Sequence, residues 1–332
     1  MKRVLAIALV VIATVGQTLA QQKPQHTQYV LNNYLTNPAV GGIESYADLR
    51  SSFRSQWVGI EGAPQTFYTT LHAPLGKQSS GSPKARKPNQ YGFSKRNSYK
   101  KTMPHHGVGA IVQVDKAGLL TASTFNGTYS YHLPLTNYFT LSSGIAAGLT
   151  QYRVNTVEAN PNDPNDPYLT GATQLNATKM DLGLGMWLYT PDFYVGVSGA
   201  QLVKSGSDIQ GDEPNLTLQP HFYTTAGLRF QPSEDLALIP SVMVKMTATS
   251  APAIDVNLRA MYNQQVWGGV TYRHTDSWAA MGGVNLNYLL DLSYSYELAT
   301  SSMKEATVGT HEVVLGIKLN NLRKVICPQF MW

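Results

Sequence analysis

Apolar and polar residues alternate with a period of two along most of the chain. In residues 290–298, Leu or Tyr occupies every second position, and Asp291, Ser293, Ser295 and Glu297 lie between them. Successive side chains of a β-strand point to opposite faces, so this pattern predicts strands with one apolar and one polar face. We identify fourteen such segments, at residues 47–54, 65–72, 107–115, 119–133, 137–152, 180–190, 192–203, 219–231, 235–248, 254–262, 265–275, 277–289, 290–298 and 312–319.

Amphipathic strands in this number can close as a soluble sandwich or propeller, or as a transmembrane barrel. Most of the segments have about 9 to 15 residues, whereas strands of soluble sheets have about 5 to 6 and tilted membrane strands about 9 to 11. The even strand number and the tyrosines near segment ends, Tyr131, Tyr262, Tyr272 and Tyr288, also fit a membrane barrel. The sequence therefore predicts an all-β fold, a transmembrane antiparallel β-barrel of about fourteen strands with both termini periplasmic.

Ionisable residues fall on the face opposite the apolar one. Only 14% of the residues are charged, and a Lys or Arg that faced lipid at the bilayer midplane would cost roughly 2–4 kcal/mol. We therefore expect the charged residues of the strands to face the lumen, namely Asp48, Arg50, Arg54, Asp181, Arg229, Lys245, Asp255, Arg259, Arg273, Asp291 and Glu297.

The first twenty residues have the layout of a secretory signal peptide. Lys2 and Arg3 precede an apolar run over residues 4–15, and small residues lead to Ala20. The run is too short for a membrane-spanning helix. We expect export with cleavage near Ala20. The predicted organisation is a signal peptide (1–20), a periplasmic N-terminal segment (21–45), an outer-membrane barrel (46–320) and a C-terminal tail (321–332).

Connection lengths predict which end of the barrel faces the periplasm, because barrels of this class have short periplasmic turns and longer external loops. The turns near Pro134, Pro191, Pro232, Gln264 and Leu290 are tight, and the longer connections lie near residues 153–178, 204–217 and 299–307. One periplasmic connection, residues 73–106, is long and basic. It carries Lys77, Lys84, Arg86, Lys87, Lys95, Arg96, Lys100 and Lys101 without any Asp or Glu.

This segment accounts for the basic character of the chain. Removing the leader lowers the basic count from 25 to 23, and removing these eight residues leaves 15, against 20 acidic residues. A general nucleic-acid surface is therefore not expected.

Residues 28–75 resemble the opening of the PorP/SprF family, outer-membrane proteins of the Bacteroidota type IX secretion and gliding machinery. The resemblance is carried by Gln28-Tyr29, Asn32, Asn37-Pro38-Ala39, Gly41, Arg54, Gln56-Trp57, Gly62, Pro64, Thr66 and His72, and continues through Gly107, Gly109, Asp115 and Gly118. It implies a barrel that works with a periplasmic lipoprotein ring of the motor and secretion apparatus, or with the export and surface attachment of an adhesin.

Three parts of the chain are candidates for partner contact. In the first, residues 25–42, we expect either a segment in or across the periplasmic mouth or a simple lead-in to the first strand. The second is the basic segment, which suits an acidic partner, and the third is the tail after residue 319, which holds the lone Cys327. The candidate partner-binding residues are Asn37, Pro38, Ala39, Arg54, Gln56, Trp57, Lys84, Arg86, Lys87, Lys95, Arg96, Lys100 and Lys101. Trp57 can equally be a girdle aromatic.

Catalytic and metal sites are not indicated. The candidate nucleophile–base pairs are Ser277 with His274 and Ser130 with His132, and we expect His274 to be an idle interfacial residue. The sequence has no GxSxG, HExxH or phosphate-loop pattern. We expect His105-His106 to be a solvated loop pair, and residues 160–167, rich in Asn, Asp and Pro, to be a rigid external loop rather than a calcium site. No cofactor is predicted.

The main hypothesis is a non-enzymatic barrel that anchors or organises a type IX secretion or gliding assembly. The alternative is a substrate-specific porin that uses its polar lumen as a channel. Charged residues together with Trp187 and Met243 on the inner face predict a blocked lumen.

Overall fold

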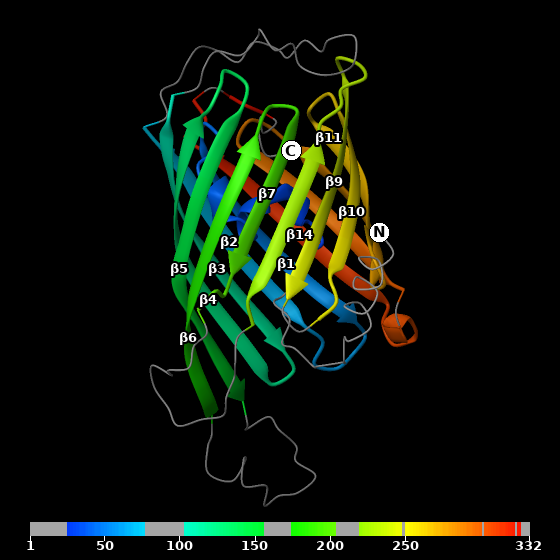
Figure 1. Cartoon of the computed structure of the whole chain (residues 1–332). Coiled ribbons are helices and arrows are strands. Elements are labelled where there is room, and N and C mark those ends of the chain that lie inside the picture. Colours follow the sequence, from blue (N-terminus) through cyan, green and yellow to red (C-terminus); the bar gives the residue numbers. More distant parts are fainter. Residues whose placement is uncertain are drawn as a thin grey trace, which may run out of the picture.

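Fourteen antiparallel strands close into a single barrel, which confirms the predicted fold class (Figure 1). Each strand pairs with its neighbours in sequence, and β1 pairs with β14 to complete the ring. The protein is described by a computed structural model. It covers residues 25–76, 103–155, 174–203, 219–247, 250–300, 302–322 and 324–326.

The strands are longer on one side of the barrel than on the other. The first seven are β1 (Ala47–Val58), β2 (Gln65–Leu75), β3 (His105–Ala117), β4 (Leu120–Pro134), β5 (Thr140–Asn155), β6 (Gln174–Tyr189) and β7 (Phe193–Ala200). The second seven are β8 (His221–Leu228), β9 (Leu236–Thr247), β10 (Ala253–Tyr262), β11 (Val266–Arg273), β12 (Ser277–Asn285), β13 (Leu290–Ala299) and β14 (Gly309–Leu319). The long strands β4 to β6 therefore stand beside the short strands β7 and β8.

The barrel has two different ends, as the connection lengths predict. We call the end where β1 begins the turn end; it lies at the top of Figure 1. At this end, short turns join β4 to β5, β6 to β7, β8 to β9, β10 to β11 and β12 to β13. They consist of residues 135–139, 190–192, 229–235, 263–265 and 286–289, in that order. The opposite end, the loop end, carries the connections 156–173, 201–220 and 300–308, the last with the short 3-10 helix η5 (Ser302–Glu305). That the turn end faces the periplasm stays a prediction.

The basic connection is an exception to the short turns. It joins β2 to β3 at the turn end, but it is shorter than the sequence predicts because β2 continues to Leu75 and β3 begins at His105. Residues 77–102, which include all eight basic residues of this segment, lie outside the described part of the chain.

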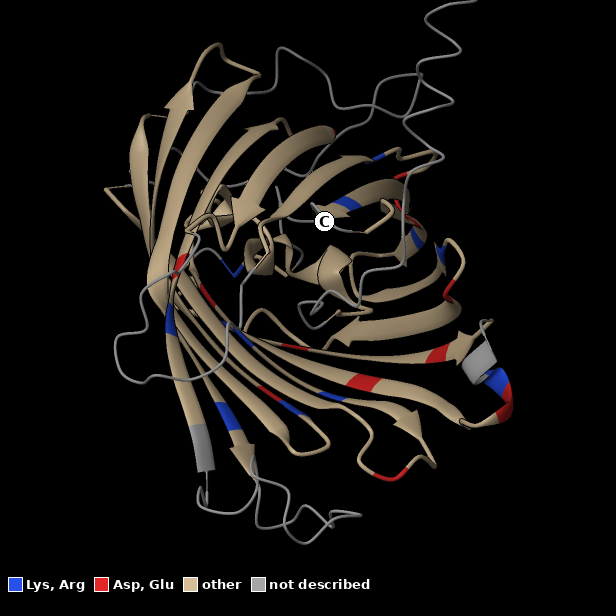
Figure 2. Ribbon diagram, turned by 60° about the horizontal axis from the view of Figure 1, so that its bottom comes forward, with Lys and Arg blue, Asp and Glu red and all other residues tan. Residues whose placement is uncertain are grey.

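The outer surface of the wall is apolar and the lumen is polar. Phe125, Val256 and Leu292 are among the exposed apolar side chains, whereas the buried residues of the same strands are largely polar or charged. Charged residues are sparse along the ribbon (Figure 2). This inverted distribution is that of a barrel whose outer face meets hydrocarbon. Among the described residues, no helix is long and apolar enough to cross a membrane.

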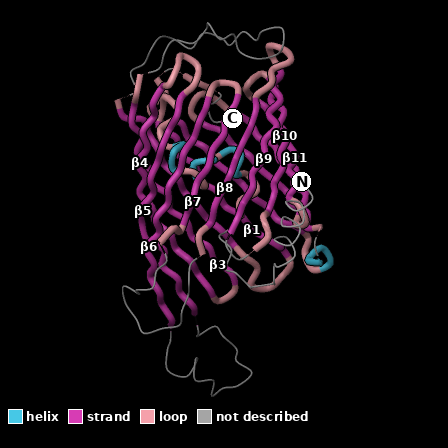
Figure 3. Tube along the Cα trace, in the orientation of Figure 1, coloured by secondary structure: helices cyan, strands magenta, loops and turns pink. Residues whose placement is uncertain are grey.

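Residues 25–46 fold inside the barrel, and we call this segment the plug. It contains three short 3-10 helices, η1 (Tyr29–Leu31), η2 (Asn33–Leu35) and η3 (Pro38–Val40), which cross the interior in Figure 3. Tyr34, Ala39, Val40 and Ile43 are fully buried. The plug therefore lies within the barrel, deeper than either alternative predicted from the sequence, a segment in or across the mouth or a simple lead-in to the first strand.

Local chemistry shapes the plug. The Asn37 side chain accepts a hydrogen bond of 3.0 Å from the Ala39 N–H and so caps η3, and Pro38 occupies the first helical position, where its fixed φ is favourable. Gly42 follows with φ of +72°, a value that other residues rarely adopt, and turns the chain toward β1.

Candidate functional site: the plug and its seat

The first residues of the plug bind acidic side chains of the wall. The Thr27 N–H donates to Glu312 Oε2 at 2.8 Å, and the Gln28 side-chain amide donates to the Glu312 carbonyl at 2.9 Å. Ser293 Oγ in turn donates to Gln28 Oε1 at 2.6 Å. The Thr27 hydroxyl bonds with both Arg54 and Glu297. This end of the plug is thus fixed by polar contacts to β1, β13 and β14.

The side chains that hold Thr27 belong to a larger ion network within the lumen. Asp255 lies 2.7 Å from Lys245 Nζ and 3.4 Å from Arg273 Nε, and Glu297 lies 2.9 Å from Arg273 and 3.2 Å from Arg54. Arg54 also approaches Glu312 at 3.4 Å. Alternating charges reduce the cost of burial. The network ties together β9, β10, β11, β13, β1 and β14.

A second group of charges lies nearer the turn end. Arg50 pairs with Asp48 at 3.1 Å and approaches Asp291 at 3.8 Å, and Lys318 approaches Asp291 at 3.5 Å. Lys318 Nζ also donates to the Ile326 carbonyl at 2.5 Å. The described residues of the C-terminal tail are therefore folded back against the wall.

The remaining predicted lumen charges are buried as well. Asp181 accepts from Asn126 Nδ2 at 3.0 Å, and the Arg259 guanidinium lies 5.5 Å from the centre of the Trp267 ring. Arg229 is also buried. Glu312 is the central acidic residue that the sequence analysis misses. It follows the same alternation, on the polar face of β14, so its parity with Lys318 could have identified it.

Polar contacts also fix the middle of the plug. Asn37 Nδ2 donates to the Met186 carbonyl at 3.0 Å and to the Val197 carbonyl at 3.1 Å, so it bridges β6 and β7. Ser198 Oγ donates to the Thr36 carbonyl at 2.6 Å, and Tyr34 shares a hydrogen bond of 2.5 Å with Thr128. Of the predicted partner-binding residues, Asn37, Pro38 and Ala39 thus contact the protein's own wall, and Arg54 of the wall contacts the plug.

Glycines of the wall make room for the plug. A Cβ at Gly185 would lie 2.0 Å from Asn37 Oδ1, and one at Gly144 would lie 2.4 Å from the Ala39 nitrogen. At Gly107 it would lie 2.1 Å from the Gly41 oxygen, and at Gly109 it would lie 2.4 Å from the Tyr34 hydroxyl. Real side chains do not tolerate such distances. The close approach of plug and wall explains two glycines of the family resemblance, Gly107 and Gly109.

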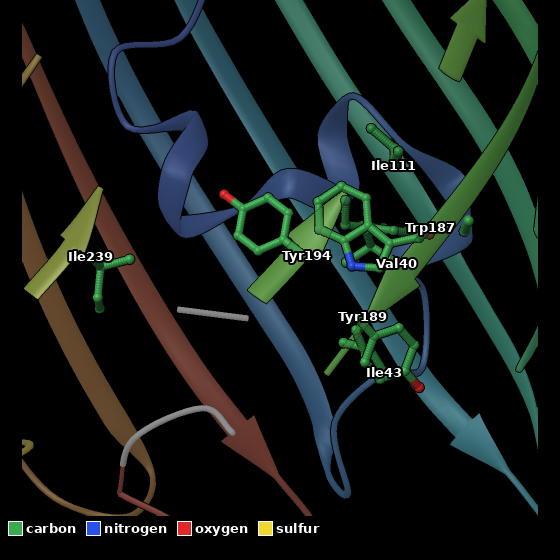
Figure 4. Packing of buried hydrophobic residues seen from close by; sticks show 9 residues of the cluster. Val40, Ile43, Ile111, Trp187, Tyr189, Tyr194 and Ile239 are labelled. Carbon is green, nitrogen blue, oxygen red and sulfur yellow. The ribbon is translucent and has the colours of Figure 1, made fainter. Parts of the chain in front are cut away.

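Aromatic and aliphatic side chains fill the space between plug and wall (Figure 4). Trp187 stacks on Tyr194 with ring centres 4.6 Å apart, beside Val40 and Ile43 of the plug. Met243 belongs to a second apolar cluster that includes Tyr29 and Leu31. Trp187 and Met243, the two residues that the sequence analysis assigns to the lumen, are both 1% exposed.

Three histidines surround the Gly41–Gly42 hinge, and we call His72, His105 and His132 the histidine clasp. The Gly42 N–H donates to His72 Nδ1 at 3.2 Å. His132 Nε2 lies 2.7 Å from the Gly41 oxygen, and His105 Nε2 lies 3.2 Å from the Gly42 oxygen. The His105 and His132 rings are stacked, with centres 4.4 Å apart and planes within 1°.

The expectation that His105-His106 form a solvated loop pair is wrong. Both belong to β3, and His105 is 1% exposed because strand alternation turns its ring inward to the clasp. His106 points outward and bonds the Tyr129 hydroxyl at 2.7 Å. The described residues contain no group of three or more His, Cys, Asp or Glu side chains arranged to hold a metal.

Gln56 and Trp57 lie at the loop end, far along β1 from the hinge. Trp57 has φ of +51°, and its N–H donates to Thr310 Oγ1 at 3.1 Å, where the pairing of β1 with β14 shifts register. The Gly118 N–H donates to the Gly62 oxygen at 2.9 Å, which links two neighbouring loops. The remaining candidates, Lys84 to Lys101, the stretch 160–167 and the chain from Cys327 onward, lie outside the described residues.

Comparisons with solved structures find proteins of low sequence identity that match most of the chain. The chain is similar to the toluene transporter TbuX of Ralstonia pickettii, with 10% identity, 89% of this chain and 94% of that chain covered, and a TM-score of 0.50. It also resembles a FadL homologue of Pseudomonas aeruginosa, with 11% identity, 92% and 96% coverage and a TM-score of 0.47. A search of curated proteins finds no match.

The family comparison covers most of the chain. The model described as type IX secretion system membrane protein PorP/SprF matches residues 18–317. Together with the barrel, this match makes the protein an outer-membrane component of that secretion system. The chain belongs to the PorP/SprF family of type IX secretion system membrane proteins.

Proposed function

We propose that the protein is a closed, non-enzymatic scaffold in the outer membrane. In this proposal it anchors the periplasmic lipoprotein ring of the type IX secretion and gliding machinery, or supports secretion and surface attachment of a partner adhesin. Family membership supports action together with other components of the secretion machinery. The observation that carries the scaffold role is the plug, which is hydrogen-bonded to the wall along its length.

A closed lumen argues against the porin alternative. A porin needs a continuous water-filled path through the barrel. Here seven plug residues have no exposed surface, and the ion network crosses the lumen side of six strands. The similarity to a toluene transporter concerns the fold, at 10% identity.

The nucleophile–base candidates support a structural role. Ser130 Oγ lies 3.4 Å from His132 Nε2, but it donates instead to the Gly41 oxygen at 2.6 Å, and His132 contacts the same oxygen. Both side chains therefore hold the plug. His274 is exposed beside a turn at the loop end, and Ser277 donates to Glu297.

The turn end is the proposed contact surface for the periplasmic partner. The tail is ordered there by Asn321, whose amide donates to the Tyr288 carbonyl at 2.6 Å and the Val325 carbonyl at 2.8 Å. The basic connection starts and ends at the same end of the barrel, after Leu75 and before His105. Its charges would attract an acidic surface within a screening length of about 8 Å at physiological salt.

Affinity purification from outer membranes tests the proposal. Tagged mature protein should recover a ring lipoprotein or a secreted adhesin, and deletion of residues 84–101 should lower that recovery several-fold while the barrel keeps its heat-modifiable mobility. Replacing two exposed basic residues of the loop end, Lys116→Ser with Arg153→Ser, is the control and should leave recovery unchanged. Recovery of neither partner class by the wild type would contradict the scaffold role. Unchanged recovery after the deletion would show that the basic connection does not contribute to partner binding.

A further inference from the structure

The histidine clasp grips the plug where it turns toward β1. Its three rings come from β2, β3 and β4, and their nitrogens meet three backbone groups of only two residues, Gly41 and Gly42. All three rings are buried. The two apolar clusters of the interior contain none of them. This arrangement makes the hold on the hinge depend on the protonation of histidine.

Hydrogen-bond geometry assigns the protonation states that the clasp requires. His72 Nδ1 accepts from the Gly42 N–H, so this nitrogen carries no proton. His132 Nε2 donates to the Gly41 oxygen, while its Nδ1 lies 3.1 Å from the Tyr189 hydroxyl, which can donate to it. A proton on His72 Nδ1 would face the Gly42 N–H with a second donor. Protons on both stacked rings would place two positive charges 4.4 Å apart.

We propose that the histidine clasp is a proton-sensitive latch: a proton on His72 Nδ1 removes the acceptor of the Gly42 N–H, protons on both stacked rings drive His105 and His132 apart, and the hinge end of the plug is released. Histidine side chains that reach water after release take up protons near pH 6.5, whereas burial opposes their protonation in the closed state, so acidification below that value favours release. The inference rests on the closed lumen of the proposed function, because release of the plug is detected as the opening of a conducting path through the barrel.

Charged and titratable groups also surround the clasp. Asp48 of β1 lies opposite His72 in the strand pairing, but Arg50 engages its carboxylate at 3.1 Å. Tyr34 of the plug meets the His72 ring edge-on at 4.6 Å, and Tyr189 of β6 meets His132. Glu44 is the buried acidic residue of the plug itself. The two tyrosines stay neutral below pH 8, so only the histidines and the carboxylates can change charge in acid.

Conductance measured against pH tests the latch. Mature full-length protein in a planar bilayer should be silent at pH 7.5 and should open reversibly as the pH falls to 4.5. Open probability should rise by up to about 100-fold per pH unit if two protons drive the transition. The variant His72→Asn/His105→Gln/His132→Gln keeps an acceptor or donor at each contacting position but cannot titrate, so it should stay silent throughout. His106→Gln, next to the clasp but facing outward, should open like the wild type.

The possible outcomes separate this latch from the scaffold proposal. A wild type that stays silent at pH 4.5 overturns the latch and leaves the closed lumen intact. Acid opening of the triple variant, or loss of opening in His106→Gln, also overturns it. If the triple variant fails to fold, His105→Gln alone should show a shallower pH response, and an unchanged response overturns the latch. Current at pH 7.5 contradicts the closed lumen, and the latch then stands only if acid raises that current in the wild type and not in the triple variant.

Discussion

Arg54 is one of the residues that carry the family resemblance, and it also belongs to the ion network of the lumen. It is 1% exposed and pairs with two carboxylates from different strands, Glu297 and Glu312, while it also bonds the Thr27 hydroxyl of the plug. Removing one member of a buried ion pair leaves an uncompensated charge, which costs more than the pair itself contributes. Arg54 therefore stabilises the wall and the plug together.

The variant Arg54→Met should lower the free energy of unfolding by about 3–5 kcal/mol, because it leaves two buried carboxylates without their shared cation. Urea unfolding of the protein refolded into lipid vesicles measures the change. Arg153→Met is the matched control, since Arg153 is exposed and its guanidinium contacts Asn176 at 3.3 Å. The control should lose less than about 1 kcal/mol. Equal losses in both variants would refute the role of the buried pair.

Strand alternation explains why most buried charges of the strands were predictable, although Glu312 and Lys318 were missed. Asp48, Arg50 and Arg54 share the parity that is buried in β1, as the sequence indicates. Glu312 and Lys318 obey the same rule in β14, and their shared parity could have placed both in the lumen. His105 was misplaced because the predicted strand starts at residue 107, two residues after β3 begins.

At the scale of elements, the strands were predictable and the plug was not. A strand repeats its pattern every two residues, so its face can be read from the sequence. The plug has three short 3-10 helices without a repeating apolar face, and its position is set by contacts to β4, β5, β6 and β7. Those contacts join residues about 90 to 160 positions apart in the chain. A single sequence cannot show such pairings.

Asn37 should control how firmly the plug is seated. The variant Asn37→Ala loses the cap of η3 and both bonds to the wall, at a cost of about 1–2 kcal/mol in local opening. Amides of residues 39–43 should then exchange hydrogen about 5- to 30-fold faster, measured by mass spectrometry, while strand amides stay protected. Asn176→Ala, which removes an amide from the outer side of β6, should leave plug exchange unchanged. Equal exchange in Asn37→Ala and the wild type would show that the seat does not depend on this residue.

At the scale of the whole molecule, the apolar outer face, the polar lumen and the plug depend on one another. The outer face suits lipid, and the charges that cannot face lipid are grouped inside, where they fix the plug. The alternation of apolar and polar residues predicts the barrel, and the family match indicates the secretion system. The closed interior depends on how plug and wall fit, and that fit rests on glycines whose role appears only in three dimensions.

Ion conductance at neutral pH tests most directly whether the plug closes the barrel. The wild type should be silent at pH 7.5, and Gly144→Val/Gly185→Val should conduct because both new side chains would occupy the space of residues 37–39. Gly127→Val, at a site whose nearest neighbour to a Cβ lies 3.9 Å away, should stay silent. Stable current through the wild type, or a silent double variant with a folded barrel, would contradict the account.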